Sequence, residues 1–486
     1  MTLTQSTPWF LCSVIVITLW RALSSYFMGH SLYGDEAQYW FWSQELAWGY
    51  YSKPPLMAWV IHFSNALFGD SPFAVRLFPL ITYPLSAVAV YLLGTNMFSK
   101  RHGFWMGLGF LTIPGISFSS FLASTDPLLL LFWSWAILFF WLALKTNSLK
   151  WWLGVGICLG LGFLTKYAMV AFLGSMILVA LCSQERSLLF KRPSFWLALA
   201  IGFAFLLPNI YWNRENGFVS FVHTLDNASL GAKFFRLKYL PEFLAGQFGL
   251  MGPLLFPILC FSLTRHIKNI WQDPARQFLT LFTLPLFVFF TLKAFLSGAH
   301  PNWTAPAYLS GTMLAVHWVL ELKNQRWLLL VFVINFGALA GLNHHAFLLE
   351  TLNIPRSKIV QTFKSSIYWD QVAEQMIQRA ESNPTINIIA TDDRMMTAGI
   401  LYNLRHTELR VRKWNPSKQV HDTFDMKVPL SNDTPKDILV LSKRTPIESV
   451  QRYADSVEEL PPIVITMGQN FSKKFRVFLL KDFKGF

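Results

Sequence analysis

Two adjacent carboxylates, Asp35 and Glu36, lie just after the first apolar stretch, in the segment GDEAQYW at residues 34–40. Carboxylates at a membrane edge are costly to desolvate, and they usually bind or transfer something. A carboxylate beside a substrate can orient a hydroxyl nucleophile and accept its proton while it remains ionised. The pair could instead be a solvated loop edge or a charge pair at a helix N-terminus. The aromatic residues around it favour chemistry, so we take Asp35 and Glu36 as candidate catalytic residues.

Two lysines are candidate substrate-binding residues. Lys53 precedes the rigid pair Pro54-Pro55. It could neutralise a phosphate as a point charge, or anchor the chain at the membrane interface by snorkelling. Lys166 interrupts an otherwise apolar stretch, and an intramembrane cation requires a partner or a polar cavity.

Three further polar residues complete the candidate set. Asp126 stands before Pro127, where it could be the N-cap of the following helix or a second functional carboxylate. His300 and Asn302 belong to the segment HPNW. His300 could be an interfacial loop residue, a metal ligand or a sugar-phosphate contact. We add Asp126, His300 and Asn302 to the substrate-binding candidates.

The composition indicates what must position these groups. The 486 residues are 53% hydrophobic and 14% charged, whereas soluble domains carry about 25% charged residues. The chain also holds 20 Trp and 45 Phe, as expected where rings line bilayer interfaces. These values predict a polytopic membrane protein. The net charge of +14 is better explained by basic loops facing anionic lipid than by nucleic acid.

Apolar stretches of about 20 residues predict about eleven transmembrane helices. They lie near residues 9–28, 72–98, 104–122, 127–145, 151–165, 168–183, 194–212, 240–263, 277–294, 305–321 and 327–343. The first is interpreted as a retained span rather than a removed signal peptide. We therefore expect a transmembrane domain over 1–345, with a first external loop at about 29–71.

A different pattern follows the last span. Short apolar runs at 386–390, 437–441, 462–465 and 476–480 predict strands, and amphipathic segments at 367–380 and 394–404 predict helices. We expect residues 346–486 to form a small soluble α/β domain.

Charge asymmetry predicts the orientation. With the N-terminus in the cytoplasm, every inside loop is short and basic, as the positive-inside rule requires. The candidate residues and the C-terminal domain then all lie outside. One outside loop, 213–239, departs from this pattern because it carries basic residues that could serve a ligand: Arg214, Lys233, Arg236 and Lys238.

The motifs also carry a family resemblance in their order along residues 30–320. They are the GDEAQYW segment, Lys53 with its two prolines, the run from 68 to 77, Asp126 with its neighbours, LTKY at 164–167 and HPNW at 300–303. Together they resemble the bacterial GT-C glycosyltransferases related to protein O-mannosyltransferases and lipid A aminoarabinose transferases.

The resemblance implies a reaction and a location. Such enzymes transfer a sugar from a polyprenyl-phosphate carrier, undecaprenyl phosphate in bacteria, to an acceptor outside the cytoplasmic membrane. It implies that Asp35, Glu36 and Asp126 are the family's acidic residues and that Lys53 holds the carrier phosphate, followed by Lys166 and His300. The expected protein is a multi-pass inner-membrane enzyme with a periplasmic active site. Its expected acceptor is lipid A or another envelope glycolipid, with protein as the alternative.

A departure bears on a metal ion. In the aminoarabinose transferase branch, a metal-binding Glu typically precedes the Lys-Pro-Pro motif, whereas this chain has Ser52. A hydroxyl is a poorer ligand for a divalent ion than a carboxylate. Glu36 and His300 could still form a site, so a divalent metal cofactor stays open, and no other cofactor is expected.

Two classes of protein compete with this interpretation. A transporter or flippase of lipid-linked sugars would also have many spans and intramembrane charges, but it would not need acidic and basic groups gathered on one face. Transporters also often show two related halves, which this sequence lacks. A structural envelope protein would explain the C-terminal domain but would leave Asp35, Lys53 and Lys166 without a role.

Overall fold

The computed structural model describes residues 6–27, 29–182, 189–228, 239–266, 272–353, 368–431, 437–443, 445–466 and 472–486. The chain divides into two compact units, which we name by content. The helical unit comprises Met1–Phe27, Lys53–Met57 and Arg76–His344, and the mixed unit comprises Met28–Ser52, Ala58–Val75 and His345–Phe486. One limit of these units falls between His344 and His345, and the predicted domains 1–345 and 346–486 stay predictions. The segment predicted as the first external loop groups mostly with the C-terminal residues.

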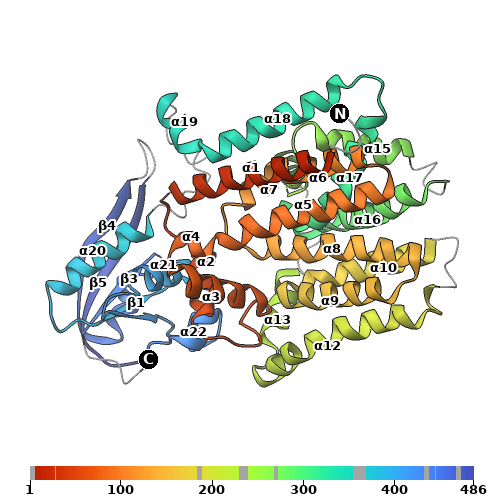
Figure 1. The fold of residues 1–486 in the computed structure, drawn as a ribbon. Helices are drawn as coiled ribbons and strands as arrows, with labels where there is room; N and C mark the ends of the chain where they lie inside the picture. The colour runs from red at the N-terminus through yellow and green to blue at the C-terminus, as the bar shows by residue number, and fades with distance from the viewer. Residues whose placement is uncertain are drawn as a thin grey trace. The chain divides into compact units, whose positions relative to one another are not determined.

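The described part of the helical unit consists of helices, which run side by side in Figure 1. They are α1 (Ser6–Phe27), α5 (Leu77–Met97), α6 (Lys100–Thr112), α7 (Pro114–Ser119), α8 (Thr125–Thr146), α9 (Leu149–Thr165), η1 (Tyr167–Met169), α10 (Val170–Cys182), α12 (Pro193–Glu215), α13 (Val219–Ala228), α14 (Tyr239–Met251), α15 (Leu255–His266), α16 (Pro274–Ser297), η3 (Pro301–Thr304), α17 (Ala305–Glu321) and α18 (Arg326–Asn343).

Among the described residues, six helices are long and apolar enough to cross a membrane. A seventh crossing results if α14 and α15, which are bent by 105°, count as one span. The prediction of about eleven spans is therefore not confirmed. Where its residues are described, each predicted span overlaps helix, but several of these helices are short. The span predicted at 104–122, for example, is broken at Pro114, whose ring cannot continue the hydrogen-bonding pattern of α6.

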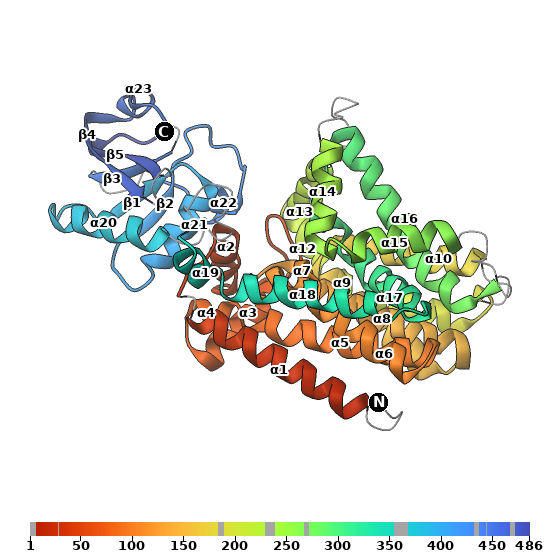
Figure 2. The same cartoon turned by 90° about the horizontal axis from the view of Figure 1, so that it is seen from above.

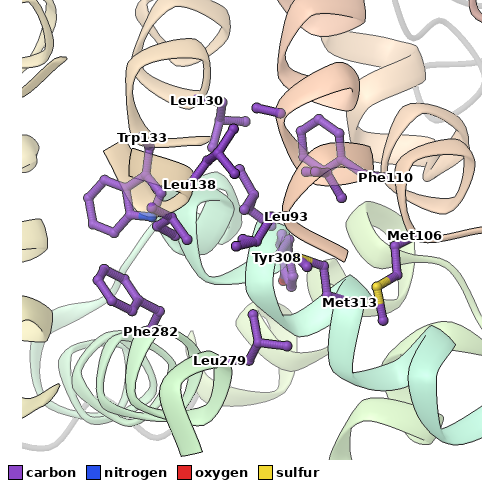
Figure 3. Packing of buried hydrophobic residues seen from close by; sticks show 14 of the residues in the cluster. Leu93, Met106, Phe110, Leu130, Trp133, Leu138, Leu279, Phe282, Tyr308 and Met313 are labelled. Atoms are coloured by element: carbon purple, nitrogen blue, oxygen red, sulfur yellow. The ribbon is translucent and has the colours of Figure 1, made fainter. Parts of the chain in front are cut away.

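Large side chains from several helices fill the core of this unit. Figure 3 shows Trp133 of α8 beside Phe282 of α16, with Tyr308 and Met313 of α17 close by. Trp133 and Phe282 are fully buried. Because lipid tails are as apolar as these side chains, close packing rather than the hydrophobic effect holds membrane helices together. This packing fixes the helix ends that carry the polar candidates.

The mixed unit combines helices with one sheet. Its elements are α2 (Gly34–Ser43), most of α3 (Leu56–Phe68), α4 (Pro72–Val75), α19 (His345–Thr351), α20 (Trp369–Glu381), β1 (Ile388–Thr391), α21 (Arg394–Asn403), β2 (Arg410–Lys413), α22 (Thr423–Lys427), β3 (Ile438–Ser442), α23 (Ile447–Gln451), β4 (Ala454–Thr466) and β5 (Ser472–Phe483).

Within the described residues the sheet has five strands, in the order β2-β1-β3-β5-β4. Strand β1 pairs in parallel with β2 and β3, whereas β5 runs antiparallel to β3 and β4. The four predicted strands overlap β1, β3, β4 and β5, and the predicted helices overlap α20 and α21. The edge strand β2 was not predicted, because its sequence RVRK offers Val411 as its single apolar residue.

Candidate functional site

In the helical unit, three predicted substrate-binding residues meet at the ends of different elements. The Lys166 ammonium lies 2.7 Å from Asp126 Oδ1. The Asn302 amide donates a hydrogen bond of 2.9 Å to Asp126 Oδ2. Asp126 lies in the first turn of α8, Lys166 follows α9, and Asn302 belongs to η3. Lys53 also lies near enough to interact electrostatically with the Asp126 carboxylate.

The local backbone explains how Lys166 reaches this cluster. The residue has an extended conformation, with φ −159° and ψ 130°, between the end of α9 and the start of η1. The neighbouring Tyr167 hydroxyl donates a hydrogen bond of 2.9 Å to Asn209 Oδ1, which anchors the break to α12. Asp126 follows the N-cap position, which Ser124 occupies. Its carboxylate is therefore engaged by Lys166 and Asn302 rather than serving as an N-cap.

His300 lines a nearby cavity of about 380 Å³ in the same unit. Tyr239, Glu242, Lys293 and Trp303 also line this cavity. The His300 and Trp303 ring centroids are 5.5 Å apart, and the Lys293 ammonium donates to the Gly298 carbonyl at 3.1 Å. Aromatic walls with a few polar groups are typical of small-molecule sites. Of the unusual basic loop, Lys233, Arg236 and Lys238 lie outside the described residues.

In the mixed unit, the two predicted catalytic carboxylates have different environments. The Asp35 carboxylate accepts a 2.8 Å hydrogen bond from Nη1 of Arg394. The same Nη1 donates to Oε1 of Gln38 at 2.6 Å. Burial alone would lower the pKa of Arg394, but the charge of Asp35 and the hydrogen bond to it outweigh this effect and raise that pKa. The guanidinium is thus a permanent cation beside Asp35.

Glu36, by contrast, is fully buried. Its Oε2 accepts a 2.8 Å hydrogen bond from the Tyr33 amide, directly before α2. This contact satisfies a donor that the helix itself cannot pair. The geometry is that of a carboxylate at a helix N-terminus, which is one of the interpretations that the sequence allowed. A catalytic role for Glu36 stays a prediction.

Sequence reasoning missed Arg394. The predicted helix at 394–404 begins with this residue, and α21 begins there in the structure. A cation in the first turn is unfavourable, because the helix N-terminus carries partial positive charge. That misplaced charge was the available signal for a functional residue.

No group of three or more His, Cys, Asp or Glu side chains that could hold a metal ion occurs within the described ranges. The divalent metal therefore stays a prediction.

Comparisons with known proteins place the chain in a family. Residues 52–212 match the family model described as dolichyl-phosphate-mannose-protein mannosyltransferase. The lipid A galacturonosyltransferase RgtD of Rhizobium johnstonii is 31% identical over 440 residues, covering 88% of this chain and 89% of that protein. The chain belongs to the GT-C family of membrane glycosyltransferases. The predicted resemblance is thus confirmed.

Two further comparisons are with aminoarabinose transferases. The undecaprenyl phosphate-α-4-amino-4-deoxy-L-arabinose arabinosyl transferase of Pseudomonas savastanoi is 29% identical to the GT-C protein over 163 residues, 33% of this chain and 31% of that one. The crystal structure of ArnT from Cupriavidus metallidurans, bound to undecaprenyl phosphate, covers 98% of both chains with a TM-score of 0.69 and 16% identity. The structural likeness confirms a GT-C fold for a multi-pass membrane protein.

Proposed function

We propose that this GT-C protein transfers a sugar from an undecaprenyl-phosphate donor to lipid A or another envelope glycolipid. The observation that carries the proposal is the similarity to lipid A galacturonosyltransferase RgtD, which extends over 88% of the chain and so spans both units. The fold shared with ArnT, which was crystallised with undecaprenyl phosphate, supports the carrier.

The candidate residues supply what this transfer needs. The acceptor oxygen attacks the anomeric carbon, and the bond from that carbon to the carrier phosphate oxygen breaks. Negative charge grows on the departing lipid phosphate, where a cation stabilises the transition state more than the ground state. Lys53 is proposed for this role. Asp35 orients the acceptor hydroxyl and accepts its proton.

An acceptor that is already an ionised phosphate, as on lipid A, requires no base. Asp35 then acts by position and charge. The two cases share the same bond changes at the anomeric carbon and differ only in the fate of a proton. The nature of the acceptor therefore decides the role of Asp35.

Asp126, Lys166, Asn302 and His300 are proposed to bind the donor. The Asp126 carboxylate fixes the Lys166 ammonium and the Asn302 amide, so both donors are pre-oriented for a phosphate or a sugar hydroxyl. The cavity beside His300, at about 380 Å³, has the size of a small-molecule site, for which about 300–1,000 Å³ is usual.

We place the reaction on the periplasmic side of a bacterial inner membrane. The short basic loops of the sequence support this orientation through the positive-inside rule. A topology reporter fused after residue 486 should be active in the periplasm. A cytoplasmic signal from that reporter contradicts this orientation.

Protein is a second candidate acceptor. The family model that matches residues 52–212 describes a protein mannosyltransferase, and this supports O-glycosylation by the same chemistry. The two proposals differ in the acceptor alone.

A reconstitution experiment tests both. The full-length protein in lipid nanodiscs is incubated with undecaprenyl-phosphate-linked galacturonic acid, aminoarabinose or mannose, and with lipid A or a Ser/Thr-rich peptide. Mass spectrometry should detect a sugar added to lipid A. Addition to the peptide alone favours protein glycosylation. Transfer to neither, together with movement of labelled donor across liposome bilayers, supports a flippase and overturns the proposal.

A further inference from the structure

Helix α2, which carries Asp35, packs directly against α21 of the C-terminal α/β domain (Figure 2). A Cβ atom at Gly34 would lie 2.5 Å from the Met395 sulfur and 3.1 Å from the Met395 Cα. The first turns of α2 and α21 are therefore so close that only a glycine fits at position 34. The Trp40 and Tyr402 rings make an edge contact at 5.0 Å. All of these residues belong to the mixed unit.

The chain around Arg394 is built to present this side chain. Strand β1 ends at Thr391, and Asp393 caps α21 by accepting hydrogen bonds from the Met395 and Met396 amides. The cap sets where α21 begins, and Arg394 is its first residue. A cation at that position opposes the helix dipole. Its compensating interaction is the ion pair with Asp35 at 2.8 Å.

We propose that Arg394 is a positioning residue for Asp35, which makes the C-terminal α/β domain part of the catalytic apparatus. This inference rests on the proposed function of Asp35. One guanidinium nitrogen holds both Asp35 Oδ1 and Gln38 Oε1, so the carboxylate is fixed relative to its own helix. Among the described residues, no protein group donates a hydrogen bond to Asp35 Oδ2, and about a third of the side chain is exposed. That oxygen can face the acceptor.

The test compares three single variants in the nanodisc transfer assay. Arg394→Ala should lower kcat by about 100-fold, the order of effect that misplacing a catalytic group has, while KM for donor and acceptor stays within about twofold. Arg394→Lys keeps the charge and should recover part of the lost kcat. It should not recover all of it, because an ammonium lacks the planar geometry of the guanidinium.

Arg405→Ala is the matched control. Arg405 lies just after α21 and pairs with Asp70 of the first external loop, with Nε 3.3 Å from Oδ2. It therefore joins the same two chain segments without touching Asp35. Its kcat should equal that of the wild type in protein that elutes as a folded monodisperse species.

A double variant shows whether Arg394 acts through Asp35. In an Asp35→Asn background, Arg394→Ala should cause no further loss of kcat, because groups acting as one unit are not additive. A further loss of 10-fold or more overturns the inference. So does a wild-type kcat in Arg394→Ala, or a raised donor KM with unchanged kcat, which would make Arg394 a substrate ligand. A wild-type protein that transfers no sugar overturns the proposed function and this inference together.

Discussion

Two carboxylate–cation pairs of similar length differ in how far their side chains are exposed. Asp126 and Lys166 in the helical unit lie 2.7 Å apart, with side chains 13% and 21% exposed. Asp35 and Arg394 in the mixed unit lie 2.8 Å apart, with side chains 34% and 36% exposed. Both oxygens of Asp126 accept hydrogen bonds, from Lys166 and Asn302, whereas Asp35 accepts its hydrogen bond from Arg394 at Oδ1.

The difference in exposure between the two pairs indicates that their carboxylates have different roles. A buried pair is costly to break, because the remaining charge stays out of water without its partner. Such a carboxylate holds its neighbours in place and is poorly suited to take up a proton. A carboxylate that is about a third exposed, with one oxygen that accepts no hydrogen bond from the described residues, can meet a substrate at little cost. The comparison is therefore consistent with the proposed roles: Asp35 in the reaction, and Asp126 as the carboxylate that orients the donor-binding groups Lys166 and Asn302.

The largest expected effect tests the assignment of reaction. Asp35→Asn preserves the shape of the side chain but removes its charge and its ability to accept a proton. Turnover should fall by about 100- to 10,000-fold if the acceptor is a hydroxyl. The initial rate of sugar transfer in nanodiscs measures this. Asp70→Asn, in the same unit, is the control, and full activity of Asp35→Asn refutes the base assignment.

A stability measurement tests the assignment of support. Asp126→Ala leaves the Lys166 ammonium without its carboxylate and should lower the free energy of unfolding by about 3 kcal/mol. Asp35→Ala should cost less than about 1 kcal/mol, because its pair is partly exposed and solvent-screened. Denaturant unfolding in the same detergent compares the two. An equal loss in the free energy of unfolding for Asp126→Ala and Asp35→Ala would contradict the proposed difference between the two ion pairs.

The double variant Asp126→Ala/Lys166→Met tests whether the loss of stability comes from an unpaired charge. Removing both charges should restore much of the stability, since no unpaired ion is then left among the helix ends. Lys166→Met alone leaves the carboxylate unpaired and should be destabilising. A double variant as unstable as the sum of the singles would mean that the ion pair is not what couples the two positions.

The sequence predicted the buried pair better than the exposed one. Lys166 stands in an apolar stretch, and the cost of a lone intramembrane cation implied a partner that proved to be Asp126. Arg394 lies 359 positions after Asp35 in the chain. No local pattern encodes such a contact. It depends on the way α2 packs on α21, which local composition does not determine.

Tertiary context also explains why the number of membrane spans was not confirmed and why the strand β2 was not predicted from the sequence. Composition identified apolar segments, but Pro114 and the bend between α14 and α15 decide whether a segment crosses in one piece. β2 became a strand by pairing with β1, although its own residues are mostly charged. Tertiary context decided these features, whereas hydrophobicity decided the helices and the inner strands.

A smaller effect is expected at Lys53, the cation proposed for the carrier phosphate. Lys53→Ala should weaken binding of undecaprenyl phosphate by about 10-fold, which corresponds to about 1.4 kcal/mol. The charge of Lys53 also interacts with Asp126, so this variant additionally tests the surroundings of the Asp126–Lys166 pair. Microscale thermophoresis with the carrier in detergent measures the affinity. Lys427→Ala, at an exposed pair with Glu45, is the control, and unchanged affinity in Lys53→Ala contradicts the phosphate role.

The smallest effect is expected at Asp392, whose carboxylate is held by neutral hydrogen-bond donors and not by a cation as Asp126 and Asp35 are. Burial alone would raise the pKa of Asp392, but hydrogen bonds from the Ser442 and Thr445 side chains and from the Lys443 and Thr445 amides outweigh it and hold that pKa below its usual value. A lowered pKa contributes stability above the unfolded value, which is about 3.9. That contribution is lost as pH falls through the folded value.

Ser442→Ala removes one of these donors, at 2.6 Å from Asp392 Oδ2. The variant should therefore be less stable than wild type at pH 7, by about 1 kcal/mol, the usual contribution of one hydrogen bond. The difference should shrink as pH falls below about 4, because a protonated Asp392 no longer gains from the charge-assisted bond in either protein. Melting midpoints from pH 7 to pH 3 measure it. Ser382→Ala, whose exposed hydroxyl bonds only to its own helix in the described chain, should show no such pH dependence. A pH-independent deficit in Ser442→Ala would mean that packing, rather than the charge on Asp392, makes Ser442 stabilising.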